Sequence, residues 1–259
     1  MLKPTGIIPH EFPEDWDSIE IFPLSDLHIG DPKADVPLFR KFVAMIQERP
    51  NRYLIYNGDN LNNAIKTSVS NVYNETMNPN EQRKWLAAEL DRIRDRFLCF
   101  VCGNHEYRSK KDVDLSAAEW LADKLGCPYY SDDEAALKIS LGKGENGKRV
   151  TYGLYVTHGN GGGKYVGGAL NNVENLALTI EGADIVVVGH VHKKAASKPA
   201  VRVMDLQNNV MRQKDKLCVI SSHWADFGGY AARKMYRPSS KGSVPIILSG
   251  REKLAQAVI

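Results

Sequence analysis

Two kinds of hydrophobic pattern alternate along the first 192 residues of this chain. Continuous runs rich in β-branched and aromatic residues predict strands that are buried on both faces. They cover residues 19–24, 53–56, 97–102, 150–156 and 185–188. Other segments repeat apolar residues every three or four positions, which predicts amphipathic helices at residues 35–48, 79–97, 115–125 and 167–182. This alternation of strands and helices predicts an α/β fold.

The rest of the chain carries shorter patterns. Residues 135–141 and 149–156 resemble two strands joined by a turn, and a last strand is predicted at residues 244–248. Residues 200–206, 210–212 and 217–221 resemble strands of a second, antiparallel sheet, with Asn208-Asn209 at a turn. Residues 1–17 read as an irregular leader that docks Phe12 and Trp16 on the body, and residues 62–78 read as a long connection.

Length and composition indicate one globular domain with a sizeable core, because the chain has 259 residues and 43% of them are hydrophobic. Residues 1–192 are expected to form the core that carries the motifs below. Residues 193–259 are expected to add strands to the second sheet and a basic tail within the same domain. No apolar run approaches the roughly 18 residues of a membrane span, and the N-terminal residues do not resemble a secretory signal.

Four cysteines are present, and two of them, Cys99 and Cys102, are three residues apart. This pair lies in a predicted strand, where residues three apart point to opposite faces, and no second such pair completes a zinc site. We therefore predict buried, reduced, structural cysteines and a cytoplasmic setting.

The net charge of +3 is unevenly distributed. Residues 193–259 hold 13 lysines and arginines against four acidic residues, a net charge of +9, whereas residues 1–192 have a net charge of −6. Such a basic segment attracts polyanions, although a solvated surface explains it equally well. The segment also carries Trp224, Phe227, Tyr230 and Tyr236 among Arg233, Lys234 and Arg237. Aromatics in this setting either stack nucleic-acid bases or pack a terminal subdomain or a dimer contact.

Five short polar blocks stand immediately after the five predicted buried strands. They read Asp26-Leu27-His28, Gly58-Asp59-Asn60, Gly103-Asn104-His105-Glu106, Thr157-His158-Gly159 and Gly189-His190-Val191-His192. Five of the seven histidines of the chain fall in these blocks. Loops at the carboxyl ends of strands are the usual position of sites in α/β proteins, so these side chains are expected to meet at one edge of a sheet.

The blocks supply what a pair of divalent cations requires, namely oxygen and nitrogen ligands and one group shared by both ions. Asp59 is the best candidate for the shared ligand, because it ends a buried strand and Gly58 permits a close approach. Asp26 and His28 alternate on an extended segment and can both turn toward one ion where the strand ends. His190 and His192 have the same spacing. Each block alone is a weak signal, but five in this order are improbable by chance.

The series DxH, GD, GNHE, HG and GHxH over residues 26–192 resembles the calcineurin-like metallophosphoesterase superfamily. The resemblance implies a four-layer αββα sandwich of two mixed sheets with a binuclear metal centre at the sheet edge. It implies that Asp26, His28, Asp59 and His192 hold the first metal, and that Asp59, Asn104, His158 and His190 hold the second. It also implies that His105 is the catalytic general acid. We expect Mn²⁺, although Fe, Zn, Ni or Co suit the same ligands.

The expected reaction is hydrolysis of a phosphodiester, in a nucleotide or nucleic acid, by a metal-activated hydroxide. Two divalent cations, two aspartates and a hydroxide leave a net charge of +1, which favours a phosphate ester. The protein Ser/Thr phosphatase branch has an Asp-Arg pair shortly after its GD block, whereas this chain has Asn62 and Asn63. The alternatives are a phosphomonoesterase, acting on a phosphoprotein or small metabolite, and a non-catalytic scaffold. Expected partners are the phosphate ester, DNA or RNA, and a second copy in a homodimer, but no membrane.

Four further residues are predicted to contact the substrate: Asn60, Arg108, Asn160 and Lys164. The last two lie in the glycine-rich stretch 159–168, which follows His158. Its backbone amides and Lys164 suit a phosphate, whereas the alternative is a connection that needs positive φ angles. A solvated loop explains Arg108, Lys110 and Lys111 equally well, and a packing role is favoured for His223.

Overall fold

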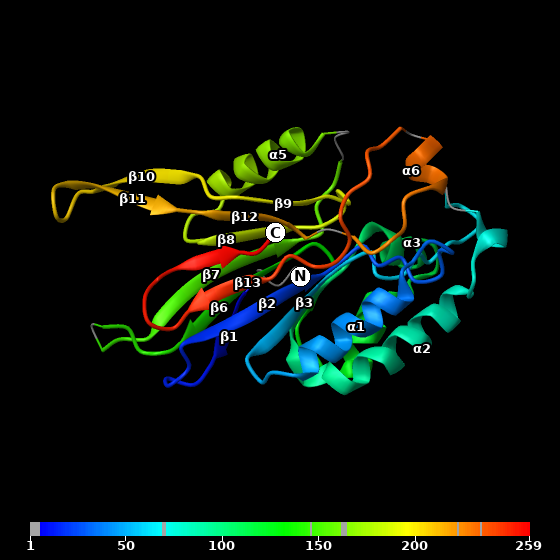
Figure 1. The fold of residues 1–259 in the computed structure, drawn as a ribbon, viewed down its shortest axis with the longest axis horizontal. Coiled ribbons are helices and arrows are strands. Elements are labelled where there is room, and N and C mark those ends of the chain that lie inside the picture. Colours follow the sequence, from blue (N-terminus) through cyan, green and yellow to red (C-terminus); the bar gives the residue numbers. More distant parts are fainter. Residues whose placement is uncertain (1–5, 69–70, 146, 162–164, 222, 234) are drawn as a thin grey trace.

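The fold is a sandwich of four layers. The computed structural model describes residues 6–68, 71–145, 147–161, 165–221, 223–233 and 235–259. Two six-stranded mixed sheets pack face to face, and helices cover both outer faces (Figure 1). The predicted αββα architecture is therefore confirmed.

The first sheet has the strand order β14-β13-β2-β3-β4-β5. Its strands are β2 (Ser18–Leu24), β3 (Arg52–Asn57), β4 (Phe97–Val101), β5 (Tyr130–Ser131), β13 (Ile246–Ser249) and β14 (Ala255–Ala257). Strands β2 to β5 are parallel, whereas β13 runs antiparallel to β2 and β14 to β13. The strand predicted at residues 244–248 is thus β13, but β14 follows it.

The second sheet has the order β1-β6-β7-β8-β12-β9. Its strands are β1 (Ile7–Glu11), β6 (Glu134–Leu141), β7 (Val150–Thr157), β8 (Ile185–Val188), β9 (Lys194–Ser197) and β12 (Leu217–Ser221). The prediction of an irregular leader was wrong, because β1 pairs in parallel with β6. That pairing is long-range and β1 is a short edge strand, so no local pattern announces it. Phe12 and Trp16 do pack on the body, beside Tyr53.

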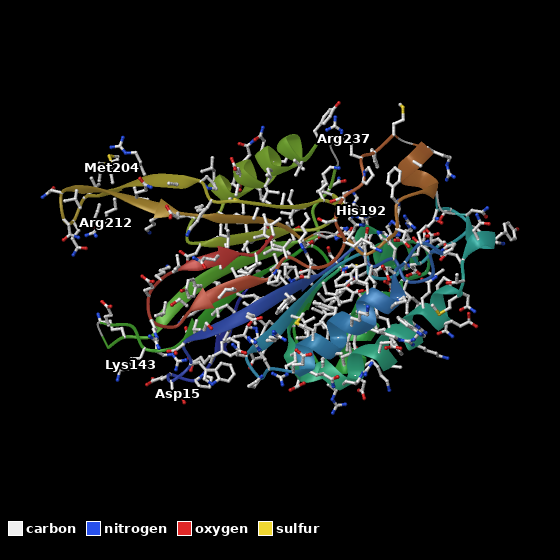
Figure 2. All side chains as sticks on the ribbon, in the orientation of Figure 1. Asp15, Lys143, His192, Met204, Arg212 and Arg237 are labelled. Carbon is white, nitrogen blue, oxygen red and sulfur yellow. The ribbon has the colours of Figure 1, made fainter. Side chains whose placement is uncertain are left out.

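Of the three strands predicted for a separate antiparallel sheet, only two form such a sheet. β10 (Ala200–Asp205) and β11 (Val210–Asp215) make a two-stranded hairpin, whereas β12 enters the second sheet between β8 and β9. The hairpin projects from the body, and Met204 and Arg212 lie near its tip (Figure 2).

Helices α1 to α4 cover the first sheet and α5 covers the second. Their bounds are α1 (Val36–Gln47), α2 (Pro79–Leu90), α3 (Asn104–Val113), α4 (Ala117–Leu125), α5 (Val166–Thr179) and α6 (Gly229–Arg233), with 3-10 turns at Val72–Asn74 and Asp91–Arg96. The four predicted helices are confirmed, although the second ends in a 3-10 turn. Helix α3 was not predicted, because Glu106 is its one fully buried residue and it shows no apolar repeat. None of the described helices combines the length and apolarity needed to cross a bilayer.

One hydrophobic core lies between the first sheet and its helices, and another lies between the two sheets. Ile21, Ile55 and Val101 of the first sheet are buried there against Leu154 and Val187 of the second. Cys99 belongs to this inter-sheet core, whereas Cys102 faces the helices, so the two cysteines point to opposite faces as predicted. All four cysteines are buried free thiols.

Candidate metal centre

The five polar blocks meet at one edge of the sandwich. Strands β2, β3, β4, β7 and β8 end where the blocks begin, and the loops that follow bring their side chains together. Three groups of side chains each place one potential ligand atom per residue within 4.8 Å of the others. They are Asp26, His28 and His192; His28, Asp59 and His105; and Asp59, His158 and His190. Because Asp59 and His28 each belong to two groups, the three groups form one continuous cluster.

The closest approaches within the cluster join its carboxylates and imidazoles. Nε2 of His158 lies 3.1 Å from Oδ2 of Asp59, and Nε2 of His192 lies 3.1 Å from Oδ1 of Asp26. Nε2 of His28 lies 3.1 Å from Nε2 of His192 and 4.0 Å from Oδ1 of Asp26. The ligand atoms thus face one another across small gaps.

The backbone is strained where these side chains are presented. Asp26, His28, Asp59, His190 and His192 have φ angles between 51° and 65°, in the left-handed region. Residues other than glycine rarely adopt this conformation, which costs about 1–3 kcal/mol and tends to cluster at functional sites. Five such residues in one cluster indicate that the fold stabilises this geometry for a function.

Two glycines allow the β3 and β4 loops to touch. A Cβ atom on Gly58, whose φ is 79°, would lie 2.5 Å from the Cα atom of Gly103. A Cβ atom on Gly103 would lie 2.2 Å from Oδ1 of Asp59. The close approach that the sequence suggested for Gly58 is therefore present, and Gly103 is equally restricted.

Hydrogen bonds to neighbouring groups orient the cluster. Nδ1 of His158 donates to the carbonyl oxygen of Asn57 at 2.7 Å, so Nε2 is the nitrogen that faces Asp59 and the cluster. Oδ2 of Asp26 accepts from the backbone amide of His190 at 3.0 Å and from the hydroxyl of Ser25. Such outer contacts are typical of metal sites, where they fix the direction of each ligand.

The carboxylate oxygens and imidazole nitrogens that face one another in the cluster suit divalent cations as ligands. Nδ1 of His190 is buried and makes no hydrogen bond among the described residues, whereas Oδ1 of Asp26 and Nε2 of His158 lie 3.1 Å from His192 and Asp59 respectively. A buried polar atom without a partner is costly, so such atoms call for a ligand. Carboxylate oxygens and imidazole nitrogens suit borderline divalent metals. The residues present therefore fit the binding of metal ions.

Electrostatics keeps the carboxylates of the cluster ionised. Burial opposes ionisation of Asp26, but His192 and His158 outweigh it and hold the pKa of Asp26 at about 2. Burial likewise opposes ionisation of Asp59, yet His158 and His105 hold its pKa well below the usual range. For His158 itself, burial disfavours the charged form, but Asp59 raises its pKa to about 10. The cluster thus offers two carboxylates in the form that binds cations.

His105 stands at the rim of the cluster with a fixed tautomer. Nδ1 lies 2.9 Å from the carbonyl oxygen of Asn62, and a carbonyl can only accept, so Nδ1 carries the proton. Nε2 lies 3.7 Å from Oδ2 of Asp59 and faces the cluster. It is the nitrogen that can take up or deliver a proton there.

The sequence model of the calcineurin-like phosphoesterase family matches residues 21–194 of this chain. The chain belongs to this family. It is therefore a metal-dependent phosphoesterase, a hydrolase that acts on ester bonds. No curated protein matches it in sequence.

Several solved structures resemble the fold at low sequence identity. A predicted phosphoesterase from Streptococcus pneumoniae is 13% identical, with 93% of this chain and 97% of that chain covered and a TM-score of 0.40. The calcineurin-like phosphoesterase YfkN from Bacillus subtilis is 12% identical, with coverages of 93% and 88% and a TM-score of 0.42. A metallophosphoesterase from Sphaerobacter thermophilus is 12% identical, with coverages of 93% and 89% and a TM-score of 0.38. The family assignment rests on the sequence match.

The other predicted site residues of this phosphoesterase lie around the cluster in different environments. Asn104 is the first residue of α3, between Gly103 and His105, and is exposed. Asn60 is fully buried, and its amide donates to the carbonyl oxygen of Leu24 at 3.0 Å. Arg108 is half-buried and donates to the carbonyl oxygen of Asn62 at 3.2 Å. Asn160 is exposed, and Lys164 lies outside the described residues.

Two residues of the basic C-terminal segment also reach this part of the phosphoesterase. His223 is buried and stacks on His192 at 5.5 Å between ring centroids, which agrees with the packing role favoured for it. Trp224 is buried against Phe39 and Phe42 of α1. This tryptophan therefore packs the body and is not available to stack a base.

Glu106 belongs to the GNHE block, but sequence patterns predict no role for it. It is fully buried, and its carboxylate accepts from the hydroxyl of Tyr56 at 2.7 Å. It also accepts from the backbone amides of Asp59 and Asn60, each at 2.8 Å, and from that of Leu61 at 3.1 Å. Glu106 thus fixes the loop that presents Asp59. The position of Glu106 directly after the predicted site residues Asn104 and His105 was the only hint in the sequence, and its burial is known from the structure alone.

Replacing Glu106 with glutamine should destabilise the phosphoesterase by about 2–4 kcal/mol, because the amide group cannot accept from all four donors and its own N–H groups oppose them. The Asp59 loop should also lose its position, so metal content should fall. Thermal unfolding and metal analysis of the purified variant measure the two effects. Glu119→Gln, on the exposed face of α4, is the matched control and should change neither. A Glu106→Gln protein with full stability and full metal content would contradict this role.

Proposed function

We propose that this phosphoesterase hydrolyses phosphodiesters in nucleotides or nucleic acid at a binuclear metal centre. Asp26, His28, Asp59 and His192 would hold one divalent cation, and Asp59, Asn104, His158 and His190 the other. The observation that carries the proposal is the position of Asp59, which belongs to two of the three ligand groups. A carboxylate common to two groups is what a pair of metals roughly 3.5–4 Å apart requires.

The ligand chemistry is compatible with several metals, of which we propose Mn²⁺. Imidazole nitrogens, carboxylate oxygens and one amide oxygen suit Mn²⁺, Fe²⁺, Co²⁺, Ni²⁺ and Zn²⁺ alike. When bound, two such cations would stabilise negative charge on the phosphate and lower the pKa of a bound water toward neutrality. The convergence of Asp26, Asp59 and the four histidines proposed as ligands, with the buried Nδ1 of His190 left without a hydrogen-bond partner among the described residues, supports this occupancy.

His105 would act as the general acid. Its Nδ1 proton is held by the carbonyl oxygen of Asn62, so proton exchange falls to Nε2. Nε2 faces the cluster, where it can hold a proton and deliver it to the leaving oxygen of the ester. Burial lowers the pKa of His105, and Asp59, 3.7 Å away, opposes that shift by favouring the protonated imidazole.

The residues that follow the Gly58-Asp59-Asn60 block favour a phosphodiester over a phosphomonoester as the substrate. A phosphomonoester dianion carries more charge than a diester and benefits from an added cation such as arginine. Asn62 and Asn63 stand where the protein Ser/Thr phosphatase branch has its Asp-Arg pair, and their amides are bound to Glu75 and to the carbonyl oxygen of His105. The nearby arginine, Arg108, is bound to the carbonyl oxygen of Asn62. The basic segment 193–259, with a net charge of +9, supports a polyanionic substrate such as DNA or RNA.

A comparison of substrates tests this proposal. With Mn²⁺ bound, the kcat/KM value for bis(p-nitrophenyl) phosphate should exceed that for p-nitrophenyl phosphate by about tenfold or more, which corresponds to about 1.4 kcal/mol. Single-stranded DNA should also be cleaved, and EDTA should abolish both activities. A preference for the monoester would favour a phosphatase instead. Purified protein without stoichiometric metal and without activity would favour a non-catalytic scaffold.

We also propose a cytoplasmic setting for this enzyme. All four cysteines are buried free thiols, and such thiols are typical of a reducing compartment. Mapping the cysteines of protein purified from its native cell, with thiols blocked at lysis, tests this point. A disulfide in that material would argue against it.

A further inference from the structure

We propose that a small pocket beside the candidate metal centre binds a nucleobase of the substrate and so selects nucleotide diesters. This inference rests on the proposed function and deepens it. The pocket, here called the side pocket, has a volume of about 110 Å³ and lies between the loop after β7 and helix α5. Its lining includes Asn160, Asn172, Val173, Leu176, Val188 and Val191.

The walls of the side pocket continue directly into the candidate ligands. Val191 stands between His190 and His192, and Val188 precedes His190 by two residues. Gly159, which also lines the pocket, follows His158. Consecutive Cα atoms are about 3.8 Å apart, so the pocket begins within one or two residues of three ligands. The pocket is thus formed by neighbours in the chain of three candidate ligands.

The lining of the pocket matches a flat ring with a polar edge. Val173 and Val188 are buried and give it an apolar wall, to which Leu176 and Val191 add. Asn160 and Asn172, both exposed at the mouth, bring amide groups from two different segments. An apolar pocket with a few converging polar groups is the usual form of a ligand site. Asparagine amides both donate and accept, as the edge of a nucleobase requires.

The size of the pocket restricts the occupant further. A cavity of about 150 Å³ lined by apolar side chains holds a benzene-sized ring. The side pocket, at about 110 Å³, is smaller and open on one side. Because it is open, it can take part of one ring of a base between its apolar walls, with the polar edge of the base left at the mouth beside the two asparagines.

The rim of the pocket favours a ligand that is anionic as well as aromatic. Tyr165 caps the start of α5, one helical turn before the pocket residue Ala169. The guanidinium of Arg237 lies 4.9 Å from the centroid of the Tyr165 ring. Arg237 lies near the start of α5 (Figure 2), and among the described residues it forms no ion pair with a carboxylate. A cation stacked on an exposed ring is suited to nucleotide phosphates and bases, and not to a neutral aryl or alkyl group.

Two diesters with the same leaving group test the proposal by kinetics. Thymidine 5′-(p-nitrophenyl phosphate) carries a base, whereas bis(p-nitrophenyl) phosphate does not. The variant Asn172→Ala should raise the KM for the thymidine ester by about 3- to 10-fold, the value of one or two lost hydrogen bonds. Its KM for bis(p-nitrophenyl) phosphate should not change. Asn171→Ala, the exposed neighbour on the same helix that does not line the pocket, is the matched control and should alter neither.

A binding measurement tests whether the side pocket binds a nucleotide, independently of the proposed reaction. Asn172→Trp should block the mouth without disturbing the fold, because residue 172 is exposed. Calorimetry with thymidine 5′-monophosphate should show weaker binding to Asn172→Trp than to Asn171→Trp and the parent protein. Retained binding, or a loss that is equal in both variants, would overturn the pocket while leaving the diester activity intact. Loss of binding in a protein that cleaves no diester would instead support the pocket and reject the proposed function.

Discussion

Replacing His105 with alanine is expected to lower kcat by about 100- to 10,000-fold while both metals stay bound, the usual contribution of general acid–base catalysis. The expectation follows from the tautomer, because the Asn62 carbonyl holds the Nδ1 proton and Nε2 faces the cluster. The loss should be larger for DNA than for bis(p-nitrophenyl) phosphate. An alkoxide leaving group needs its proton, whereas p-nitrophenolate leaves readily without one.

This experiment also separates two roles that the geometry allows. His105 forms a ligand group with His28 and Asp59, so it could hold a metal instead of donating a proton. Metal analysis of His105→Ala decides between them, because loss of a metal would make His105 a ligand. Tyr107→Ala, on an exposed position of the same helix, is the matched control and should keep both activity and metals. Full activity of His105→Ala would remove this residue from the mechanism.

Replacing Asp59 with asparagine should empty both metal positions and abolish hydrolysis. Partners outside the ligand shell typically change metal affinity by 10- to 100-fold, so loss of a shared, charged ligand should exceed about 100-fold. Asparagine has nearly the same shape and can still accept from the backbone amide of His105, which Oδ1 of Asp59 does at 2.7 Å. The fold should therefore persist, and the effect should appear in the metal content.

Metal stoichiometry and circular dichroism of Asp59→Asn measure these effects together. Asp123→Asn, on the exposed face of α4, is a control with the same change of charge and should retain both metals. Loss of only one metal would show that Asp59 is not shared. Retention of both would place the bridge on another residue.

The strands, most of the helices and the order of the polar blocks could be read from local patterns. Runs such as residues 185–188 are apolar because both faces of β8 are buried, and residues 36–47 repeat at helical spacing because one face of α1 packs on the sheet. β1 and α3 could not be read this way. β1 owes its conformation to β6, more than 120 residues away, and α3 packs on the body through Glu106 instead of an apolar stripe.

The sequence by itself determined the fold class, the family and the residues that meet at the sheet edge, because strand periodicity and five ordered motifs are local properties of the chain. Only the tertiary structure decided how these residues are used. The left-handed backbone at Asp26 and His190, the tautomer of His105 and the four bonds to Glu106 all depend on segments that are distant in sequence. The same holds for the side pocket, whose walls come from a loop, a helix and a strand end. Distances and hydrogen bonds between such segments are set by packing, and no local pattern encodes them.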